Sequence, residues 1–317
     1  MPQVPLGAVL NLASATRTLE ATQLLSLAWR QTAPAYTSGA AYPWGNPPFT
    51  ALGSWLPGYF FTQPPDAQGR AWSGLPNEEA VYGNGPVLAA GTNPFSVTNG
   101  NLVVQPRLLT PVEAATLPPA LAGRRWLSGA AVTAPFCQAG GYFEFAAQLP
   151  PMQPGLWPAF WMLPVNGQPV TELDILEVVE DAAGVVSLTT SAHSNAVASQ
   201  TTTIPVAFDP AGGQHRYGVW IQPDFVTVFF DRVAVLCYPT PPDFLCDWYL
   251  VFDLALAASG GWDGPFSGAA PGALVISDVG AWFGAVSVAA AAAPVAPLSA
   301  EAALRQIFAI AEAALAA

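Results

Sequence analysis

Short apolar runs, broken by proline, glycine and asparagine, recur through most of the chain. Residues 95–97 and 102–104 alternate apolar and polar positions on either side of Asn99-Gly100, and this dipeptide between two such runs is a strong hairpin signal. Three more runs, separated by short polar turns, follow at residues 217–221, 225–230 and 233–238. The pattern predicts many short antiparallel strands, and the fold class is therefore all-β.

The two ends of the chain differ, because their apolar residues recur at helical spacing. Residues 8–30 predict a short helix, and the segment after Ser299 predicts an amphipathic one. We expect an N-terminal extension (residues 1–40), a single sandwich domain (41–290), and a linker with a C-terminal helix (291–317). Residues 1–40 and 292–317 are expected to pack on the domain, to join copies into an oligomer, or to contact a larger assembly.

The amino-acid composition supports the prediction of many short strands and limits the kinds of molecule that the protein would bind. The 317 residues include 33 prolines and 28 glycines, which favour short strands over long helices. Only 9% of residues are charged, none is lysine, and the formal net charge is −12. Nucleic acids and anionic membrane surfaces bind basic patches, so this balance argues against both as partners.

No stretch of the sequence predicts a membrane span or an ordinary secretory signal. Residues 281–298 are apolar, but they are weakly hydrophobic alanines interrupted by Pro294 and Pro297. Residues 1–15 lack the basic start and the clear apolar segment of a signal peptide.

The three cysteines, Cys137, Cys237 and Cys246, cannot all pair within one chain. Cys237 and Cys246 flank a turn-rich connection, so they form either a disulfide or two buried thiols. No spacing of histidine and cysteine resembles a zinc site.

The strongest chemical signal is a strand-like run that carries three acids, Glu172, Asp174 and Glu177. Side chains alternate along a strand, so Glu172 and Asp174 share a face while Glu177 points away unless a bulge adds one residue between them. With that bulge the two glutamates come within reach of about 5–5.5 Å, the separation of a retaining glycosidase pair. The alternative is a structural acidic cluster, which would still require water or a ligand against its charged face.

This segment resembles the signature of family 16 glycoside hydrolases, the laminarinase-like endo-β-glycanases, in its bulged form. Further blocks match in order over about residues 70–288, at residues 77–79, 128–129, 141–144, 157–161 and 217–220. The resemblance implies a β-jelly-roll sandwich of two antiparallel sheets with a concave substrate cleft. It also implies that Glu172 is the nucleophile, that Glu177 is the acid/base and that Asp174 orients Glu172.

The same resemblance assigns substrate-binding side chains. Trp157 and Trp161 share a strand face and would wall the sugar site, and His193 would lie beside the acids. Glu78 or its neighbour Glu79 would touch sugar, and Trp262 would extend the aromatic wall. Each has a plainer alternative: core packing for the tryptophans, a structural role for His193, and a surface charge pair with its neighbour for Glu78.

The chain also departs from the family pattern. Ala146 and Gln148 stand where relatives carry an arginine and a lysine, so the ion pair or sugar contact made there is expected to be absent. Asp253 replaces an asparagine, and Arg232 disfavours a type I′ turn where relatives carry glycine. Asp278 matches an aspartate that helps to hold a structural calcium ion in relatives. No cofactor is required for the reaction.

The sequence therefore predicts an endo-acting retaining β-glycosidase that cleaves β-1,3-glucan, mixed β-1,3/1,4-glucan or a bacterial exopolysaccharide by double displacement. A neutral or weakly charged polysaccharide fits the acidic chain best. Two alternatives are a non-catalytic carbohydrate-binding module on the same fold and a depolymerase component of a larger particle. We expect the protein outside the cell or on a cell or particle surface, exported by a removed signal, by another route or with an assembly.

Overall fold

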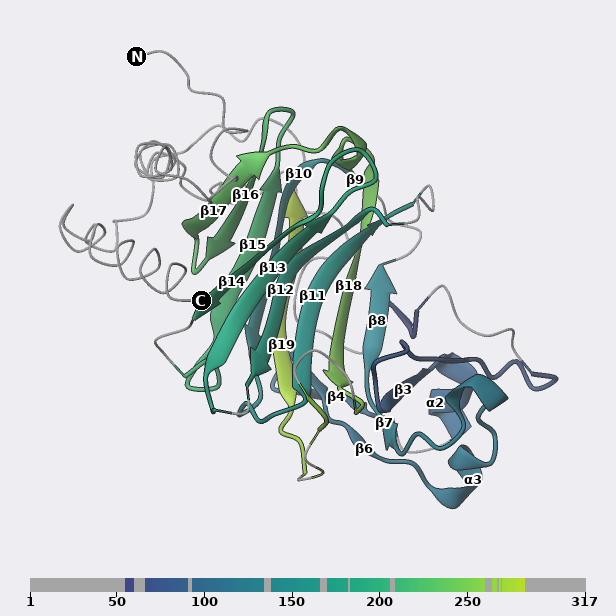
Figure 1. The fold of residues 1–317 in the computed structure, drawn as a ribbon. Coiled ribbons are helices and arrows are strands. Elements are labelled where there is room, and N and C mark those ends of the chain that lie inside the picture. Colours follow the sequence, from purple (N-terminus) through teal and green to yellow (C-terminus); the bar gives the residue numbers. More distant parts are fainter. Residues whose placement is uncertain are drawn as a thin grey trace, which may run out of the picture.

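A computed structural model describes residues 55–59, 66–90, 93–133, 138–165, 170–181, 183–205, 209–259, 264–266, 268 and 270–282. Within them the chain forms two large antiparallel sheets and a third, small sheet beside them (Figure 1). None of the described helices is long and apolar enough to cross a membrane. The predicted extensions, residues 1–40 and 291–317, lie outside the described residues, as does Trp262.

The sheet that carries the three acids has eight strands. Seven run in the order β1-β8-β18-β11-β12-β13-β14, and β9 also pairs with β18. The bounds are β1 (Trp55–Pro57), β8 (Ala130–Thr133), β9 (Gln138–Ala139), β11 (Leu156–Pro164), β12 (Glu172–Glu180), β13 (Val186–His193), β14 (Gln200–Pro205) and β18 (Asp247–Leu256).

The second sheet has seven strands in the order β17-β16-β15-β10-β19-β5-β4. The bounds are β4 (Phe95–Thr98), β5 (Asn101–Val104), β10 (Gly141–Gln148), β15 (His215–Ile221), β16 (Phe225–Phe230), β17 (Val233–Pro239) and β19 (Leu274–Trp282). The predicted hairpin joins β4 to β5, and Asn99 and Gly100 take φ values of 52° and 80°. Positive φ at both central residues is what a type I′ turn requires.

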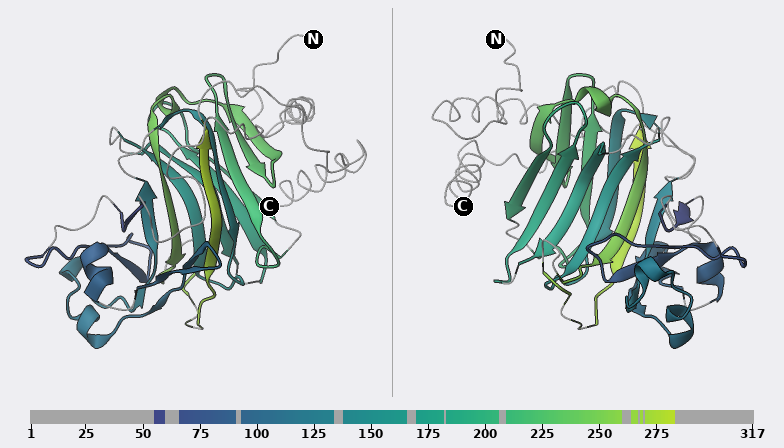
Figure 2. Two further views of the ribbon diagram at one scale, coloured as in Figure 1. Left: turned by 180° about the vertical axis from the view of Figure 1, so that it is seen from behind. Right: turned by 45° about the vertical axis from the view of Figure 1, so that its right-hand side comes forward.

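The two large sheets pack face to face around one apolar core (Figure 2). Phe143 and Phe145 of β10 are buried between the layers, while Tyr142 and Glu144 point to the other face of their sheet. Phe145 stacks on Phe160 of β11 with ring centroids 4.3 Å apart, as expected for a core position on that strand. The predicted all-β jelly-roll sandwich is therefore confirmed.

The small third sheet was not predicted. It has the order β2-β3-β7-β6, and β3 and β7 pair in parallel. Arg124 ties it together by donating to the carbonyls of Ala80 and Leu75. Its strands and the helices beside it are β2 (Trp72–Ser73), β3 (Ala80–Gly83), α2 (Gly85–Ala90), β6 (Arg107–Leu108), α3 (Pro111–Ala114), the 3-10 helix η2 (Pro119–Leu121) and β7 (Trp126–Leu127).

One expectation about the seven-stranded sheet is wrong, and an ion pair explains why. Arg232 does adopt the left-handed conformation, at φ 65°, and follows Asp231 at φ 45°. Its guanidinium makes two 3.0 Å hydrogen bonds to the buried carboxylate of Glu144, and Arg216 contacts the same carboxylate. Arg216 of β15 and Arg232 of the turn between β16 and β17 thus balance the Glu144 carboxylate, and the Arg232 contact stabilises the strained turn.

Cys237 and Cys246 are both free thiols. Cys237 is buried and accepts a hydrogen bond from Thr227. The sequence left open either a disulfide or two thiols, and the structure has two thiols.

Candidate active site

β12 contains the bulge that the three acids need. Asp174 pairs with Ser191 of β13, and Glu177 pairs with Thr189, so two residues of β12 oppose the single residue Thr190. The Thr190 hydroxyl donates to the Asp174 carbonyl at 2.7 Å and holds the irregular backbone. The extra residue returns Glu177 to the face of the other two acids.

All three acids border one cavity of about 670 Å³ on the open face of the eight-stranded sheet. The strand registers place its floor residues in rows that cross the strands. One row runs Asp253, Ala159, Glu177, Thr189, Thr203 from β18 to β14. Trp157 and Trp161 form an aromatic side of the cleft on β11, and threonine and serine hydroxyls form the opposite side on β13 and β14. The three acids of β12 lie between these two sides.

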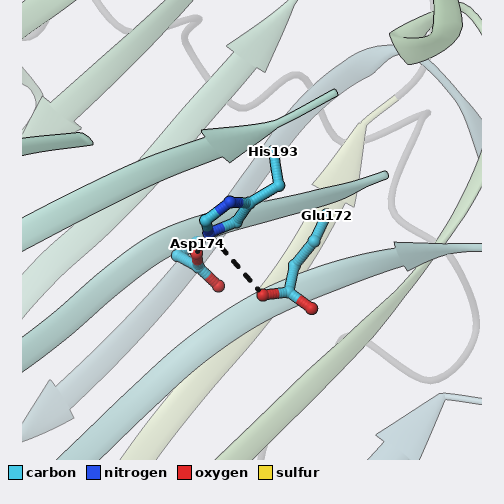
Figure 3. A group of neighbouring side chains, drawn as sticks. All are labelled: Glu172, Asp174 and His193. Atoms are coloured by element: carbon cyan, nitrogen blue, oxygen red, sulfur yellow. Dashed lines mark ion pairs between the residues drawn. The ribbon is translucent and has the colours of Figure 1, made fainter. Parts of the chain in front are cut away.

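His193 lies beside two of the acids, as Figure 3 shows. Its Nε2 is 3.3 Å from Asp174 Oδ2 and 4.0 Å from Glu172 Oε1. Glu172 and His193 pair across β12 and β13, which explains why residues so far apart in sequence meet. The Asp174 side chain is only 6% exposed, against 33% for Glu172, so Asp174 is the enclosed member of the group.

Burial and mutual repulsion raise the pKa values of these carboxyls. Burial, then the charges of Asp174 and Glu172, raises the pKa of Glu177 to about 9. Burial, then Glu172 and Asp253, raises the pKa of Asp174 well above its usual range. Burial also raises the pKa of Glu172, which the His193 beside it lowers in part. Glu177 thus holds a proton at neutral pH, as a general acid requires.

Both predicted tryptophans border the cleft. Trp157 is partly exposed, whereas Trp161 is 6% exposed and its Nε1–H donates to Asp253 Oδ2 at 2.7 Å. Core packing alone does not describe either residue, because each presents part of its ring to the cavity.

Glu78 is not part of a surface pair, since it is 4% exposed and borders the cleft. Its Oε2 accepts from the Leu75 N–H at 3.0 Å. Burial, then the charge of Asp253, raises the pKa of Glu78 to about 8. A buried acid outside β12 therefore also faces the cleft.

Two further acids near the cleft were not predicted as site residues. Asp253 was noted only as a replacement. Asp243, in the 3-10 helix η3 (Pro242–Phe244), accepts from the Thr171 and Ser194 hydroxyls at 2.7 Å each and from the Asn195 N–H at 2.8 Å. It thereby clamps the start of β12 to the end of β13, where Glu172 and His193 lie. The sequence does not predict these hydrogen bonds, because Thr171 is 72 positions from Asp243 and 24 positions from Asn195.

The residues around Asp278 do not fit the calcium ion suggested by the sequence. Arg216 Nη1 lies 3.5 Å from the Asp278 carboxylate, and this guanidinium also pairs with Glu144. A cation already balances the carboxylate, and a second one would be repelled. In the described part of the chain, donor atoms of Glu172, Asp174 and His193 lie within 4.8 Å of one another, but His193 already pairs with Asp174 there.

The glycosyl hydrolases family 16 model matches residues 112–278, which include the bulged strand and its neighbours. The chain belongs to glycosyl hydrolase family 16. Among family 16 relatives, endo-1,3-1,4-beta-glycanase EglC of Rhizobium meliloti is 34% identical over 218 residues, covering 67% of this chain and 43% of EglC. Endo-1,3-1,4-beta-glycanase ExsH of the same organism is 35% identical over 176 residues, covering 54% and 36%. The chain thus spans less than half the length of these relatives.

Solved structures of family 16 proteins share the fold. A non-specific endo-beta-1,3(4)-glucanase matches with a TM-score of 0.60 at 22% identity, over 80% of this chain and 99% of its own. The laminarinase from Rhodothermus marinus matches with a TM-score of 0.57 at 20% identity, over 80% and 99%. Both confirm the laminarinase-like jelly roll predicted from the sequence.

Proposed function

We propose that this family 16 domain is an endo-acting retaining β-glycosidase that hydrolyses β-1,3- or mixed β-1,3/1,4-glucan. The observation that carries the proposal is the shared face of Glu172, Asp174 and Glu177 at the floor of an open cleft. The names of the relatives EglC and ExsH support a β-glycan substrate. A non-catalytic binding module is not favoured, because all three acids are in place.

In this mechanism Glu172 attacks the anomeric carbon while Glu177 donates its proton to the departing glycosidic oxygen. The bond from the anomeric carbon to that oxygen breaks, and a glycosyl ester forms on Glu172. Glu177, now ionised, takes a proton from water, which attacks the same carbon and releases Glu172. Two inversions leave the anomeric configuration unchanged.

The geometry supports these roles for each group. The Glu172 side chain is 33% exposed, against 6% for Asp174, and the neighbouring His193 lowers its pKa in part, which suits an ionised nucleophile. Asp174 is enclosed between Glu172 and His193 and would orient the nucleophile. Burial, then the charges of Asp174 and Glu172, raises the pKa of Glu177 to about 9, which suits the proton donor.

The cleft lining favours an uncharged polymer. It contains five carboxyl groups, His193 and no arginine among the described residues. Sulfated or carboxylated sugars would meet repulsion without a cationic partner. Because a glycan polymer is too large and too polar to cross a membrane unaided, we place the site of action outside the cell or at a cell or particle surface.

The test is to make Glu172→Gln and Glu177→Gln separately and to measure reducing ends released from β-glucans and bacterial exopolysaccharides. Each variant should lose at least about 10³-fold in kcat, because each removes a group that acts in the transition state. Glu180→Gln, on the same strand but outside the cleft lining, is the matched control and should stay within about twofold. Full activity in either cleft variant would reject the assignment, and NMR detection of an inverted anomer would reject the retaining mechanism.

A further inference from the structure

A second pair of acids, Glu78 and Asp253, lies behind the tryptophan wall of the cleft. Both are almost fully buried, at 4% and 3% exposure, and both border the cavity. Glu78 precedes β3 of the small sheet, while Asp253 lies on β18 of the eight-stranded sheet. A backbone hydrogen bond connects the segment of Glu78 to β18, since the Glu79 N–H donates to the Leu256 carbonyl at 2.7 Å.

A hydrogen bond to Asp253 and contacts with aromatic rings fix the Trp161 side chain. The Asp253 carboxylate accepts its Nε1–H at 2.7 Å, a short contact of the charge-assisted kind. Tyr59 meets the Trp161 ring edge-on at 5.7 Å between centroids and meets the Tyr82 ring in the same way at 4.9 Å. Because Trp161 lies on β11 directly opposite Asp174, a small rotation of its ring would alter the sugar position relative to the acids.

We propose that Asp253 is a positioning residue: its carboxyl group holds the Trp161 indole against the sugar, and the charge on Asp253 sets the strength of that hydrogen bond. The proposal rests on the proposed glycosidase function only where sugar binding is concerned. It extends the site to an aspartate at which the family pattern has asparagine. An asparagine would also accept the indole N–H, so the difference between the two is the charge.

The ionisation of the pair supplies the pH dependence. Burial raises the pKa of Asp253 to about 7, although hydrogen bonds from Trp161 and Tyr59 lower this pKa in part. Burial and the charge of Asp253 raise that of Glu78 to about 8. The other ionisable groups that face the pair are Tyr59, Tyr82, Arg124, Glu172, Asp174, Glu177 and His193. Above pH 7 the ionised Asp253 accepts the indole N–H more strongly.

The first experiment does not need activity. In protein labelled with ¹⁵N-tryptophan, the Trp161 indole N–H resonance is assigned by its loss in Trp161→Phe. Asp253→Leu should move this resonance, because the acceptor is gone, while Asp253→Asn should keep it hydrogen-bonded but abolish its shift between pH 6 and 9. Asp247→Asn, an exposed change on the same strand, is the control and should leave the resonance in place.

The second experiment uses a double-mutant cycle for a β-glucan oligosaccharide. Asp253→Leu should raise KM about tenfold with kcat within about threefold, and this effect should largely vanish in a Trp161→Phe background. Asp253→Asn should raise KM by no more than about threefold at pH 6 and flatten its pH dependence. Circular dichroism checks that each variant folds.

The outcomes separate the two proposals. A wild-type protein that neither binds nor cleaves β-glucans rejects the glycosidase function, and the resonance shifts still test the contact. An unmoved resonance in Asp253→Leu overturns the positioning role. So does an equal rise in KM with Trp161 present or replaced, because Asp253 would then act independently of the indole.

Discussion

Arg232 shows how an ion pair can hold a residue in a conformation that its type disfavours. Left-handed backbone costs a non-glycine residue about 1 kcal/mol or more, and glycine would relieve that cost. Here the guanidinium reaches Glu144, whose side chain is 1% exposed and whose burial raises its pKa. Leaving a buried carboxylate with one arginine instead of two costs more than the turn strain.

We therefore predict that Arg232→Gly destabilises the protein by about 1–3 kcal/mol despite the better turn residue. In a Glu144→Gln background the same change should be neutral or stabilising, since no charge is left to balance. Urea unfolding of the four proteins at pH 7 measures both effects. An equal loss of stability in the two backgrounds would show that the ion pair does not hold the turn.

Sequence reasoning located some site residues and not others, and the reason lies in their spacing. Glu172, Asp174 and Glu177 are neighbours on one strand, so alternation and one bulge suffice to bring them together. Asp253 joins Trp161 across 92 positions, and Asp243 joins Thr171 across 72, through strand pairings that one sequence does not specify. Trp262 lies outside the described residues, so its assignment stays a prediction.

The bulge of β12 lets one strand place acids in the cleft and two consecutive apolar residues in the core. Ile175 and Leu176 are both buried in the core, although adjacent residues of a regular strand face opposite sides. Phe160 pairs with Leu176 and Trp161 with Asp174, so Ile175 is the extra residue on the β11 side as well. The strand thus keeps its apolar anchor between Asp174 and Glu177 without turning Glu177 away from the cleft.

Two single-residue deletions test this. Without Ile175 the strand becomes regular and the three acids still share a face, so measurable activity should remain, reduced by about 10²-fold through misplacement. Without Leu173, which is equally buried, Glu172 and Asp174 become adjacent and face opposite sides, so activity should fall by more than about 10³-fold. Both variants must first show β-sheet circular dichroism. Equal losses in two folded variants would contradict the role of the bulge.

At the level of elements, hairpins were predictable and the small sheet was not. The β4–β5 turn and the capping box of α3, with Thr110 and Glu113, are local signals that a few residues carry. The β3–β7 pairing joins residues about 46 positions apart in parallel and involves only two residue pairs. Strands this short leave no periodicity to read.

For the whole molecule, the buried acids make stability depend on pH in an unusual direction. The pKa values of Asp253, Glu78 and Glu177, about 7, 8 and 9, exceed those of an unfolded chain, so the folded state retains protons that the unfolded state has lost. Each retained proton stabilises the folded state fully below the unfolded pKa of about 4, and this stability is lost as the pH rises from there to the folded-state pKa. Carboxyls with lowered pKa values, such as Glu113 and Asp243, act only at lower pH.

We predict that the free energy of unfolding falls from pH 5 to pH 9, by about 1.4 kcal/mol per pH unit for each retained proton. Urea titrations at pH 5, 7 and 9 measure this slope. The double variant Glu78→Gln/Asp253→Asn should have a shallower slope, because two of the retained protons no longer titrate. A wild-type stability that increases between pH 5 and pH 8 would contradict the prediction.

The cleft is assembled from two structural units, the sandwich and the segment that leads into the small sheet. The acids and the tryptophans belong to the sandwich, whereas Glu78 is carried by the segment that leads into the small sheet and meets β18 through Ala257. Replacements in that segment can therefore change which glycan is preferred without moving the groups that break the bond. We therefore expect substitutions that alter glycan preference and substitutions that abolish cleavage to map to different parts of the chain.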